Sequence, residues 1–344
     1  MQRSMAVQHA ADRPICWPDP KPFQAALRRL QQRFMVYAAT SPAPLPANGL
    51  VVTSEIRLQC ELYLPMQEIR SLFIRYYRAS LPHEPILTST PLYDCASWAD
   101  VYATLPAWLQ GDPSPARLLE RLLTDKALHE RFIFYSFLPG RFNGNGFGRY
   151  PDQERWLLAW AGQERLNGKR GLHLLDTACG SGEGTWELAM LLAAAGWLPE
   201  QIKLTGWTIE PLEVWAATGR CLPHADQRQA EYRQLTAGLI EQGWGGRLDF
   251  KVVDLRSELE RCAEYQLILC NGLLGGPLLH EQHQMRSLVR QLADQLAPGG
   301  WLLADNCFHG GWHRLVSIDD LAMLFRQAGL TVEQIGEGLG GCRG

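Results

Sequence analysis

The sequence predicts an α/β protein in which a doubly wound, mostly parallel sheet follows a mainly helical N-terminal domain. Three observations lead to this fold class. Amphipathic helical patterns dominate before about residue 140, short apolar stretches alternate with helical patterns after about residue 170, and a glycine-rich turn follows the first of these stretches.

Composition excludes several classes of protein. The chain has 344 residues, 46% of them hydrophobic, and its net charge is -3, so we expect neither nucleic acid nor a membrane as a partner. The start lacks the apolar core of a signal peptide, and the stretch "LAMLLAAAGWL" is too short to span a bilayer, which predicts a cytoplasmic protein. The nine cysteines form no C-x-x-C pair, so no metal site is predicted.

The first half, residues 1–139, reads as a mainly helical accessory domain for substrate recognition. Residues 23–39 and 115–138 carry apolar side chains at helical spacings, and a proline begins the second stretch. Between them, "SPAPLPANG" reads as a linker, and "LVVTSEIRLQCELYL" (50–64) reads as one or two strands.

The second half, residues 140–344, alternates predicted strands with predicted helices. The strands are "GLHLLDTA", "IKLTGWTIE", "RLDFKVVDL", "YQLILCNG" and "GGWLLADN", and helices are expected over 184–195, from Pro211 and over 281–296. Short apolar strands joined by helices imply parallel pairing through right-handed crossovers. Ligands of such sheets bind beyond the carboxyl ends of the strands.

The turn after the first predicted strand is the strongest local signal. It reads "DTACGSGEG" from Asp176, and Gly180 and Gly182 allow a tight turn and close approach of a ligand to the main chain. Dinucleotide-binding enzymes use G-x-G-x-x-G with an acidic residue about twenty positions later, whereas here the acid lies at the strand end. A nicotinamide-dependent dehydrogenase remains an alternative at this point.

The phrase "DTACGSGEGTWELAMLL" resembles motif I of class I S-adenosylmethionine (SAM) methyltransferases, and within them it is most similar to the chemotaxis receptor glutamate methyltransferases. The resemblance continues through "LTGWTIEPLEVWAATG", "YQLILCNGLL", "LADQLAPGGWLLADN" and "SIDDLAMLFRQAGLTVEQI". It covers roughly residues 140 to 335 and implies a Rossmann-like class I methyltransferase fold. SAM is the implied cofactor, and S-adenosylhomocysteine (SAH) the implied product.

The resemblance implies roles for residues of the glycine loop. The methionine part of SAM would lie along the main chain, with Asp176 near its amino group and Glu183 at the helix start. The implied cofactor-binding residues of this loop are Asp176, Ala178, Cys179, Gly180, Gly182 and Glu183.

A second group of implied residues follows strands two, three and four. The acid that takes the ribose hydroxyls is expected at Thr208, but the acid here is Glu210, which would serve equally as a charge at a helix start. Asp254 with Leu255 would meet the adenine amino group. Asn271 and Gly272 would lie closest to the reactive methyl, and Asn271 alternatively belongs to an ordinary turn.

Two further side chains are candidates for handling the acceptor. His309 is the candidate general base among the loop histidines His280, His283, His309 and His313, all of which are alternatively surface residues. Arg149, in the glycine-rich stretch 137–156, would hold a carboxylate acceptor, or this stretch is an ordinary linker.

The predicted function is methyl transfer from SAM to an unidentified acceptor by in-line displacement, in which proximity and orientation supply the catalysis. A small molecule is favoured over a protein carboxylate, because "CGSGEGTWE" departs from the "CSTGEEPYS" of the chemotaxis enzymes. The alternatives are a protein glutamate methyltransferase of that type and a non-catalytic SAM-binding regulatory protein. Oligomeric state stays open.

The end of the chain departs from the family pattern. Family members finish with an antiparallel hairpin, whereas only "GEGLGGCRG" follows the sixth predicted strand, "TVEQI". The seventh strand is therefore missing, truncated or supplied elsewhere.

Overall fold

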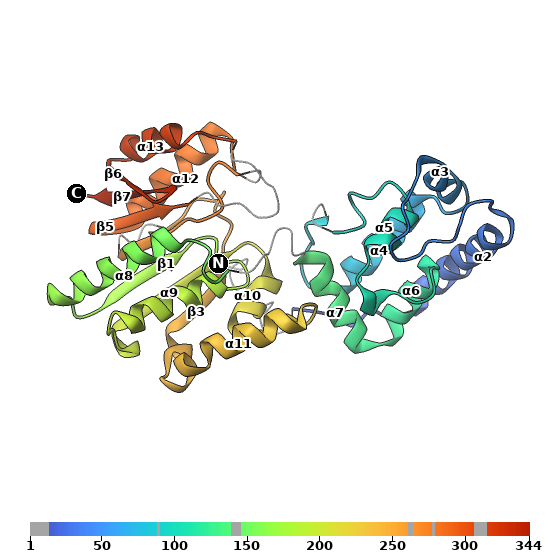
Figure 1. The fold of residues 1–344 in the computed structure, drawn as a ribbon, viewed down its shortest axis with the longest axis horizontal. Helices are drawn as coiled ribbons and strands as arrows, with labels where there is room; N and C mark the ends of the chain where they lie inside the picture. Colours follow the sequence, from blue (N-terminus) through green and yellow to red (C-terminus); the bar gives the residue numbers. More distant parts are fainter. Residues whose placement is uncertain (1–13, 88–89, 139–145, 261–263, 277–278, 306–314) are drawn as a thin grey trace. The chain divides into compact units, whose positions relative to one another are not determined.

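The chain divides into two compact units, Met1–Pro139 and Gly140–Gly344. The structure is a computed structural model and describes residues 14–87, 90–138, 146–260, 264–276, 279–305 and 315–344 (Figure 1). No helix in these ranges is both long enough and apolar enough to cross a membrane.

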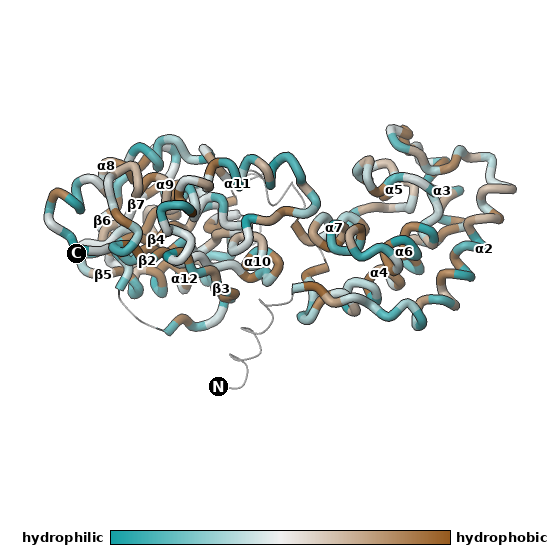
Figure 2. The backbone as a smooth tube through the Cα atoms, turned by 90° about the horizontal axis from the view of Figure 1, so that it is seen from below, coloured by the Kyte–Doolittle hydropathy of each residue, from teal (hydrophilic) through white to brown (hydrophobic). Residues whose placement is uncertain are grey.

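The described part of the first unit is helical, and hydrophilic and hydrophobic residues alternate along its helices (Figure 2). Its α-helices are α2 (Gln24–Thr40), α3 (Ser54–Tyr63), α4 (Met66–Ser80), α5 (Trp98–Thr104), α6 (Pro115–Thr124) and α7 (Lys126–Phe137).

Two predictions for this unit need correction. The stretch 50–64 contains helix α3 and no strand, because Thr53 caps the helix by accepting from the Ile56 N–H, and Ile56 and Cys60 bury one helical face. The predicted helical stretch 115–138 is two helices. Asp125 leaves the helical conformation after α6 and caps α7 by accepting from the Leu128 N–H at 3.0 Å.

The core of the first unit is aromatic and encloses a buried histidine, His129. Its Nε2 lies 3.0 Å from the Cys16 carbonyl oxygen, so this nitrogen carries the proton. The Tyr76 hydroxyl then donates to Nδ1 at 2.6 Å. Burial lowers the pKa of His129 to about 4. The neutral imidazole thus ties the N-terminal segment to α4 and α7.

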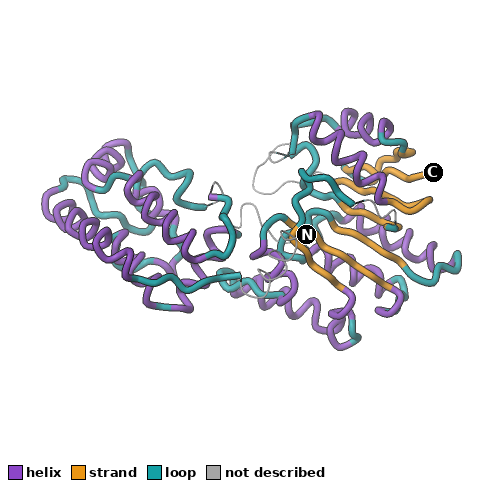
Figure 3. The backbone as a smooth tube through the Cα atoms, turned by 180° about the vertical axis from the view of Figure 1, so that it is seen from behind, coloured by secondary structure: helices purple, strands orange, loops and turns teal. Residues whose placement is uncertain are grey.

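The second unit contains a seven-stranded sheet of order β3-β2-β1-β4-β5-β7-β6 (Figure 3). Strands β1 to β5 pair in parallel, and β7 runs antiparallel to β5 and β6. This is the Rossmann-like class I methyltransferase fold that the sequence predicts. The strands are β1 (Leu172–Asp176), β2 (Ile202–Thr208), β3 (Leu248–Val252), β4 (Tyr265–Leu269), β5 (Leu296–Ala304), β6 (Leu330–Ile335) and β7 (Gly338–Arg343).

The seventh strand is present, within the C-terminal stretch to which the sequence pattern assigned no strand. Gly340 and Gly341 of β7 leave room on the faces of the sheet for neighbouring side chains: an added Cβ would lie 2.5 Å from Ile335 Cδ1 at Gly340 or 2.7 Å from Phe325 Cδ2 at Gly341. Glycine weakens the strand signal in a sequence. Close packing around β7 therefore requires glycine at these positions, and the same glycines weaken the strand pattern in the sequence.

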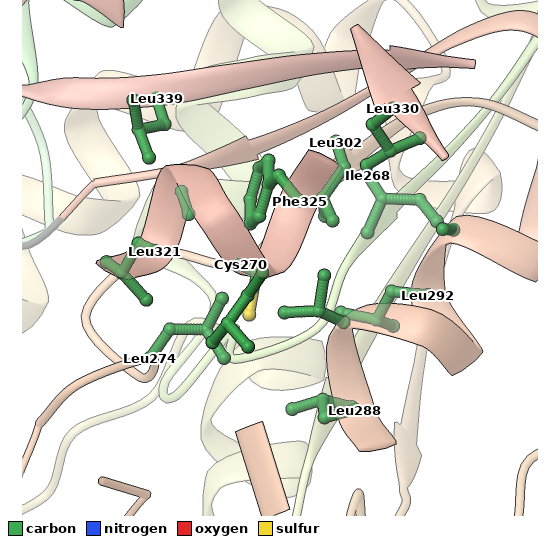
Figure 4. Packing of buried hydrophobic residues seen from close by; sticks show 14 of the residues in the cluster. Ile268, Cys270, Leu274, Leu288, Leu292, Leu302, Leu321, Phe325, Leu330 and Leu339 are labelled. Atoms are coloured by element: carbon green, nitrogen blue, oxygen red, sulfur yellow. The ribbon is translucent and has the colours of Figure 1, made fainter. Parts of the chain in front are cut away.

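Helices cover both faces of the sheet. On one face, α12 (Gln282–Gln295) and α13 (Ile318–Gln327) pack with Leu175, Ile268 and Leu302 in a buried apolar cluster (Figure 4). Side chains alternate along a strand, so Leu172 and Leu174 point to the other face. The remaining helices of this unit are α8 (Pro151–Leu166), α9 (Glu183–Ala194), α10 (Pro211–Gly219) and α11 (Asp226–Glu241).

We expect acid to destabilise the first unit through His129. Its pKa is lower in the folded state than the ordinary value of 6.5, so the unfolded chain binds the proton more tightly below that value. The contribution of His129 to the free energy of unfolding is fully present above about pH 6.5. It decreases toward about pH 4.5, where protonation of His129 in the unfolded chain lowers the free energy of unfolding by about 2 kcal/mol. The measurement is urea unfolding across this range in wild type and His129→Gln. An unchanged pH dependence in the variant would contradict the prediction, and His283→Gln, at an exposed histidine, is the matched control.

Candidate functional site

The glycine loop between β1 and α9 lies at the carboxyl ends of the parallel strands. It is tied to the neighbouring strands on both sides, because the Thr177 N–H donates to the Leu269 carbonyl at 2.9 Å and the Cys179 N–H donates to the Trp207 carbonyl at 3.0 Å. The loop is therefore fixed by the sheet before any ligand binds.

Gly182 makes the turn into α9 possible. Its φ is +85°, and Gly180 before it has φ +51°. A Cβ on Gly182 would lie 2.5 Å from Ala217 Cβ and 3.0 Å from the Tyr232 hydroxyl. The first N–H groups of a helix have no partner within it, so this turn presents donors and positive dipole at the edge of the sheet.

Asp176 lies at the end of β1, as predicted, with only 7% of its surface exposed. Its carboxylate accepts from the Thr185 hydroxyl at 2.7 Å and from the Ala178 N–H at 3.4 Å. Burial raises the pKa of Asp176 to about 6, against the lowering effect of these two donors. A buried, weakly solvated carboxylate of this kind favours a cationic group beside it.

Glu183 begins α9, as predicted, but its carboxylate is already engaged. It is 3% exposed and forms a two-pronged ion pair with Arg228 of α11. The Ser181 hydroxyl donates to it at 3.1 Å, and the Tyr232 hydroxyl donates to the Ser181 carbonyl at 3.1 Å. These contacts make Glu183 a support of the loop. Sequence reasoning missed Arg228 and Tyr232, which lie far along the chain.

The end of β2 brings two acids together, and sequence reasoning considered only one of them. Glu210 is buried and caps α10 by accepting from the Leu212 N–H at 3.1 Å, which agrees with the helix-start interpretation. Glu213, one helical turn later, accepts a hydrogen bond from the Thr208 hydroxyl. The pKa of the Cys179 thiol is raised by burial first, and then by the nearby charges of Asp176 and Glu213. The sequence signal that could have identified Glu213 is the second acid in "IEPLE", residues 209–213.

The residue after β3 occupies its predicted place with a different partner. Asp254 accepts two bonds from the guanidinium of Arg256, each 2.9 Å long, and this lowers the pKa of Asp254. Leu255 packs against the apolar cluster of α12 and α13. Their contact with adenine stays a prediction.

Asn271, after β4, holds neighbouring elements together. Its Nδ2 donates to Gln153 Oε1 at 2.7 Å, and its Oδ1 accepts from Gln153 Nε2 at 3.1 Å and from the Asp305 N–H at 2.9 Å. Gly272 follows, and its N–H donates to the Asp305 carbonyl at 2.8 Å. The proximity of Asn271 and Gly272 to a reactive methyl stays a prediction.

The residues proposed for the acceptor are placed only in part. His309 and His313 lie outside the described residues. His280 and His283 are exposed, and the guanidinium of Arg149 lies 5.2 Å from the Tyr150 ring centroid. Among the residues that the structure describes, no three or more His, Cys, Asp or Glu side chains are grouped to hold a metal ion.

Comparisons with known proteins give structural matches only. No protein-family model matches the chain, and no curated protein does. The sugar N-methyltransferase KedS8 of Streptoalloteichus matches with TM-score 0.38 and 18% identity, over 59% of this chain and 90% of its own. The magnesium protoporphyrin IX methyltransferase of Synechocystis matches with TM-score 0.35 and 14% identity, over 66% of this chain and 100% of its own.

A third match is the 4+2 cyclase SpnF, with TM-score 0.34 and 20% identity. It covers 53% of this chain, and this chain spans 59% of the cyclase. These names describe those proteins, and the reaction of this chain rests on its own site residues.

We expect the Glu183–Arg228 pair to support the glycine loop. Glu183→Gln leaves the guanidinium without its charged partner, at a cost of about 3 kcal/mol in the free energy of unfolding. Thermal unfolding measures this loss, and Arg78→Met, at an ion pair exposed on both sides, should cost much less. Equal losses in the two variants would contradict the supporting role.

Proposed function

We propose that the chain is a SAM-dependent methyltransferase that binds SAM at the carboxyl edge of β1, β2 and β4. The observation that carries the proposal is the buried Asp176 beside a glycine loop with two positive-φ glycines, at the end of β1, the middle one of the five parallel strands. The residues fit the group, because SAM brings an amino group and a sulfonium, both cationic, and the buried Asp176 carboxylate is bonded in the described structure to a hydroxyl and a main-chain N–H.

We infer that Glu213 rather than Glu210 holds the ribose hydroxyls. The Glu210 carboxylate caps α10, whereas Glu213 reaches back to Thr208, the position at which family members carry the ribose-binding acid. A carboxylate can accept two hydrogen bonds at once, which suits a pair of adjacent hydroxyls.

When bound, SAM supplies a methyl group on a sulfonium that is already a strong leaving group. The chain's own residues then have to orient the acceptor and exclude water, which by themselves contribute large rate factors. A small molecule remains the proposed acceptor, on the departure of "CGSGEGTWE" from the chemotaxis motif. Recognition of that acceptor by the first unit belongs to the same proposal.

The first test of this function is calorimetric titration with SAM, SAH and NADH in parallel. Selective binding of SAM and SAH is the expected result. Binding of NADH alone would favour the dehydrogenase, and no binding of any of the three would remove the cofactor site. Binding of SAM without turnover across a panel of acceptors would favour a regulatory SAM-binding protein.

SAM affinity should depend on pH through Asp176. The pKa of the Asp176 carboxyl is about 6 in the ligand-free protein. A bound cation favours the ionised carboxylate, so SAM binding releases a proton in the acidic range. We expect affinity to be about tenfold weaker at about pH 5 than above pH 7. Calorimetry on Asp176→Asn should show weaker binding without this pH dependence, and Glu258→Gln, at an exposed carboxylate, should match wild type. Parallel pH profiles in wild type and Asp176→Asn would refute the role.

The two acids after β2 should separate in their effects. Glu213→Gln is expected to weaken SAH and adenosine about tenfold, because both ligands carry the ribose hydroxyls. Glu210→Gln should lower the free energy of unfolding by about 1 kcal/mol through the lost cap, with little change in ligand affinity. Calorimetry and urea unfolding distinguish the two effects, and the reverse pattern would return the ribose role to Glu210.

A further inference from the structure

A reciprocal pair of amides joins α8 to the end of β4. Gln153 lies in the first turn of α8 and is 3% exposed. Its Nε2 donates to Asn271 Oδ1 at 3.1 Å, and its Oε1 accepts from Asn271 Nδ2 at 2.7 Å. Each amide thus satisfies the other, with Gln153 buried and Asn271 partly buried, across 118 positions of sequence.

The same pair also reaches β5. Asn271 Oδ1 accepts a second bond, from the Asp305 N–H at 2.9 Å, and the Gly272 N–H donates to the Asp305 carbonyl at 2.8 Å. Gln153 is therefore held against a point where β4 and β5 have both just ended. This point lies at the edge of the sheet where the cofactor is proposed to bind.

The five residues before α8, 146–150, form a strap that contacts the glycine loop region. The Gly148 N–H donates to Glu187 Oε1 of α9 at 2.6 Å, and the Phe147 ring packs edge-on against Tyr232, with centroids 5.6 Å apart. A Cβ on Gly146 would lie 2.8 Å from Glu183 Cβ. The strap thus touches the first two turns of α9 and the helix α11 that supports the loop.

The other end of the strap lies near the end of β4. The Tyr150 hydroxyl would be 3.5 Å from a Cβ placed on Gly272, and Gln153 follows one helical turn later with its bonds to Asn271. The strap therefore runs from the start of α9 to the residues after β4. The amide pair fixes its C-terminal end.

We propose that Gln153 is a positioning residue for the cofactor site: its amide pair with Asn271 holds the strap 146–150 across the glycine loop and thereby slows the release of bound SAM or SAH. The inference rests on the proposed function. Amide pairing suits this task because its hydrogen bonds are directional and fix one register, whereas an apolar contact of the same area tolerates sliding.

The chemistry of the pair predicts what its loss would do. Gln153→Leu keeps the approximate size of the side chain but removes both of its hydrogen bonds to the partly buried Asn271 amide, which keeps the bond from the Asp305 N–H. The end of α8 and the strap would then lose their fixed register against β4 and β5. SAH should bind at least tenfold more weakly, with most of the change in its dissociation rate.

The test compares three variants with wild type by SAH calorimetry, SAH dissociation rate and hydrogen exchange of the Gly148 amide. The variants are Gln153→Leu, the swapped pair Gln153→Asn with Asn271→Gln, and Gln163→Leu. The last removes a Gln–Asn bond of 2.9 Å between Gln163 and Asn167 near the far end of the same helix, and serves as the matched control.

The expected result has three parts. In Gln153→Leu, the Gly148 amide exchanges faster in the ligand-free protein and SAH dissociates faster. The swap restores the Gly148 exchange rate toward wild type, because two amides of the same summed length face each other, and Gln163→Leu matches wild type in both quantities. Unchanged Gly148 exchange in Gln153→Leu, faster exchange with unchanged SAH affinity, or a swap whose Gly148 exchange is no slower than that of the single variant would each overturn the proposal. Failure of wild type to bind SAH would instead refute the proposed function, and the exchange rates would still report on the pair.

Discussion

The close approach of the glycine loop to the helices after β2 is the constraint on which the site depends. Gly182 has no room for a Cβ between Ala217 and Tyr232, so only glycine fits at the turn from β1 into α9, where the first N–H groups of the helix have no partner within it. The same packing brings α10 and α11 against the loop. It thereby places Glu213 beside Thr208 and Arg228 beside Glu183.

The acidic residues at the carboxyl edge of the sheet fall into two groups: those that stabilise a loop or a helix end, and those that are candidates for binding the cofactor. Glu183 is paired with Arg228, Glu210 caps α10, and Asp254 is paired with Arg256. Each of these bonds fixes a loop or a helix end. Asp176 differs because its partners among the residues that the structure describes are a hydroxyl and a main-chain N–H, neither of which carries a charge. This contrast explains why the proposal for SAM centres on Asp176.

Side-chain amides join three elements at this edge of the second unit. Gln153, Asn271 and the Asp305 N–H connect α8 with the ends of β4 and β5 through partly buried hydrogen bonds, whose loss is costly. The strap before α8 is thus anchored at the edge where the proposed ligand enters. Under the proposal, support of the loop and retention of the ligand are parts of one network.

Local pattern in the sequence determined strands β1 to β6 and the position of Asp176, Gly180 and Gly182, because apolar periodicity and a glycine turn are properties of short segments. It also placed α9, α10 and α12 nearly at their observed bounds. Only the tertiary structure decided the pairing of Glu183 with Arg228, the pairing of Gln153 with Asn271 and the glycine-rich strand β7. These depend on which distant segments pack together, and no local pattern records that choice.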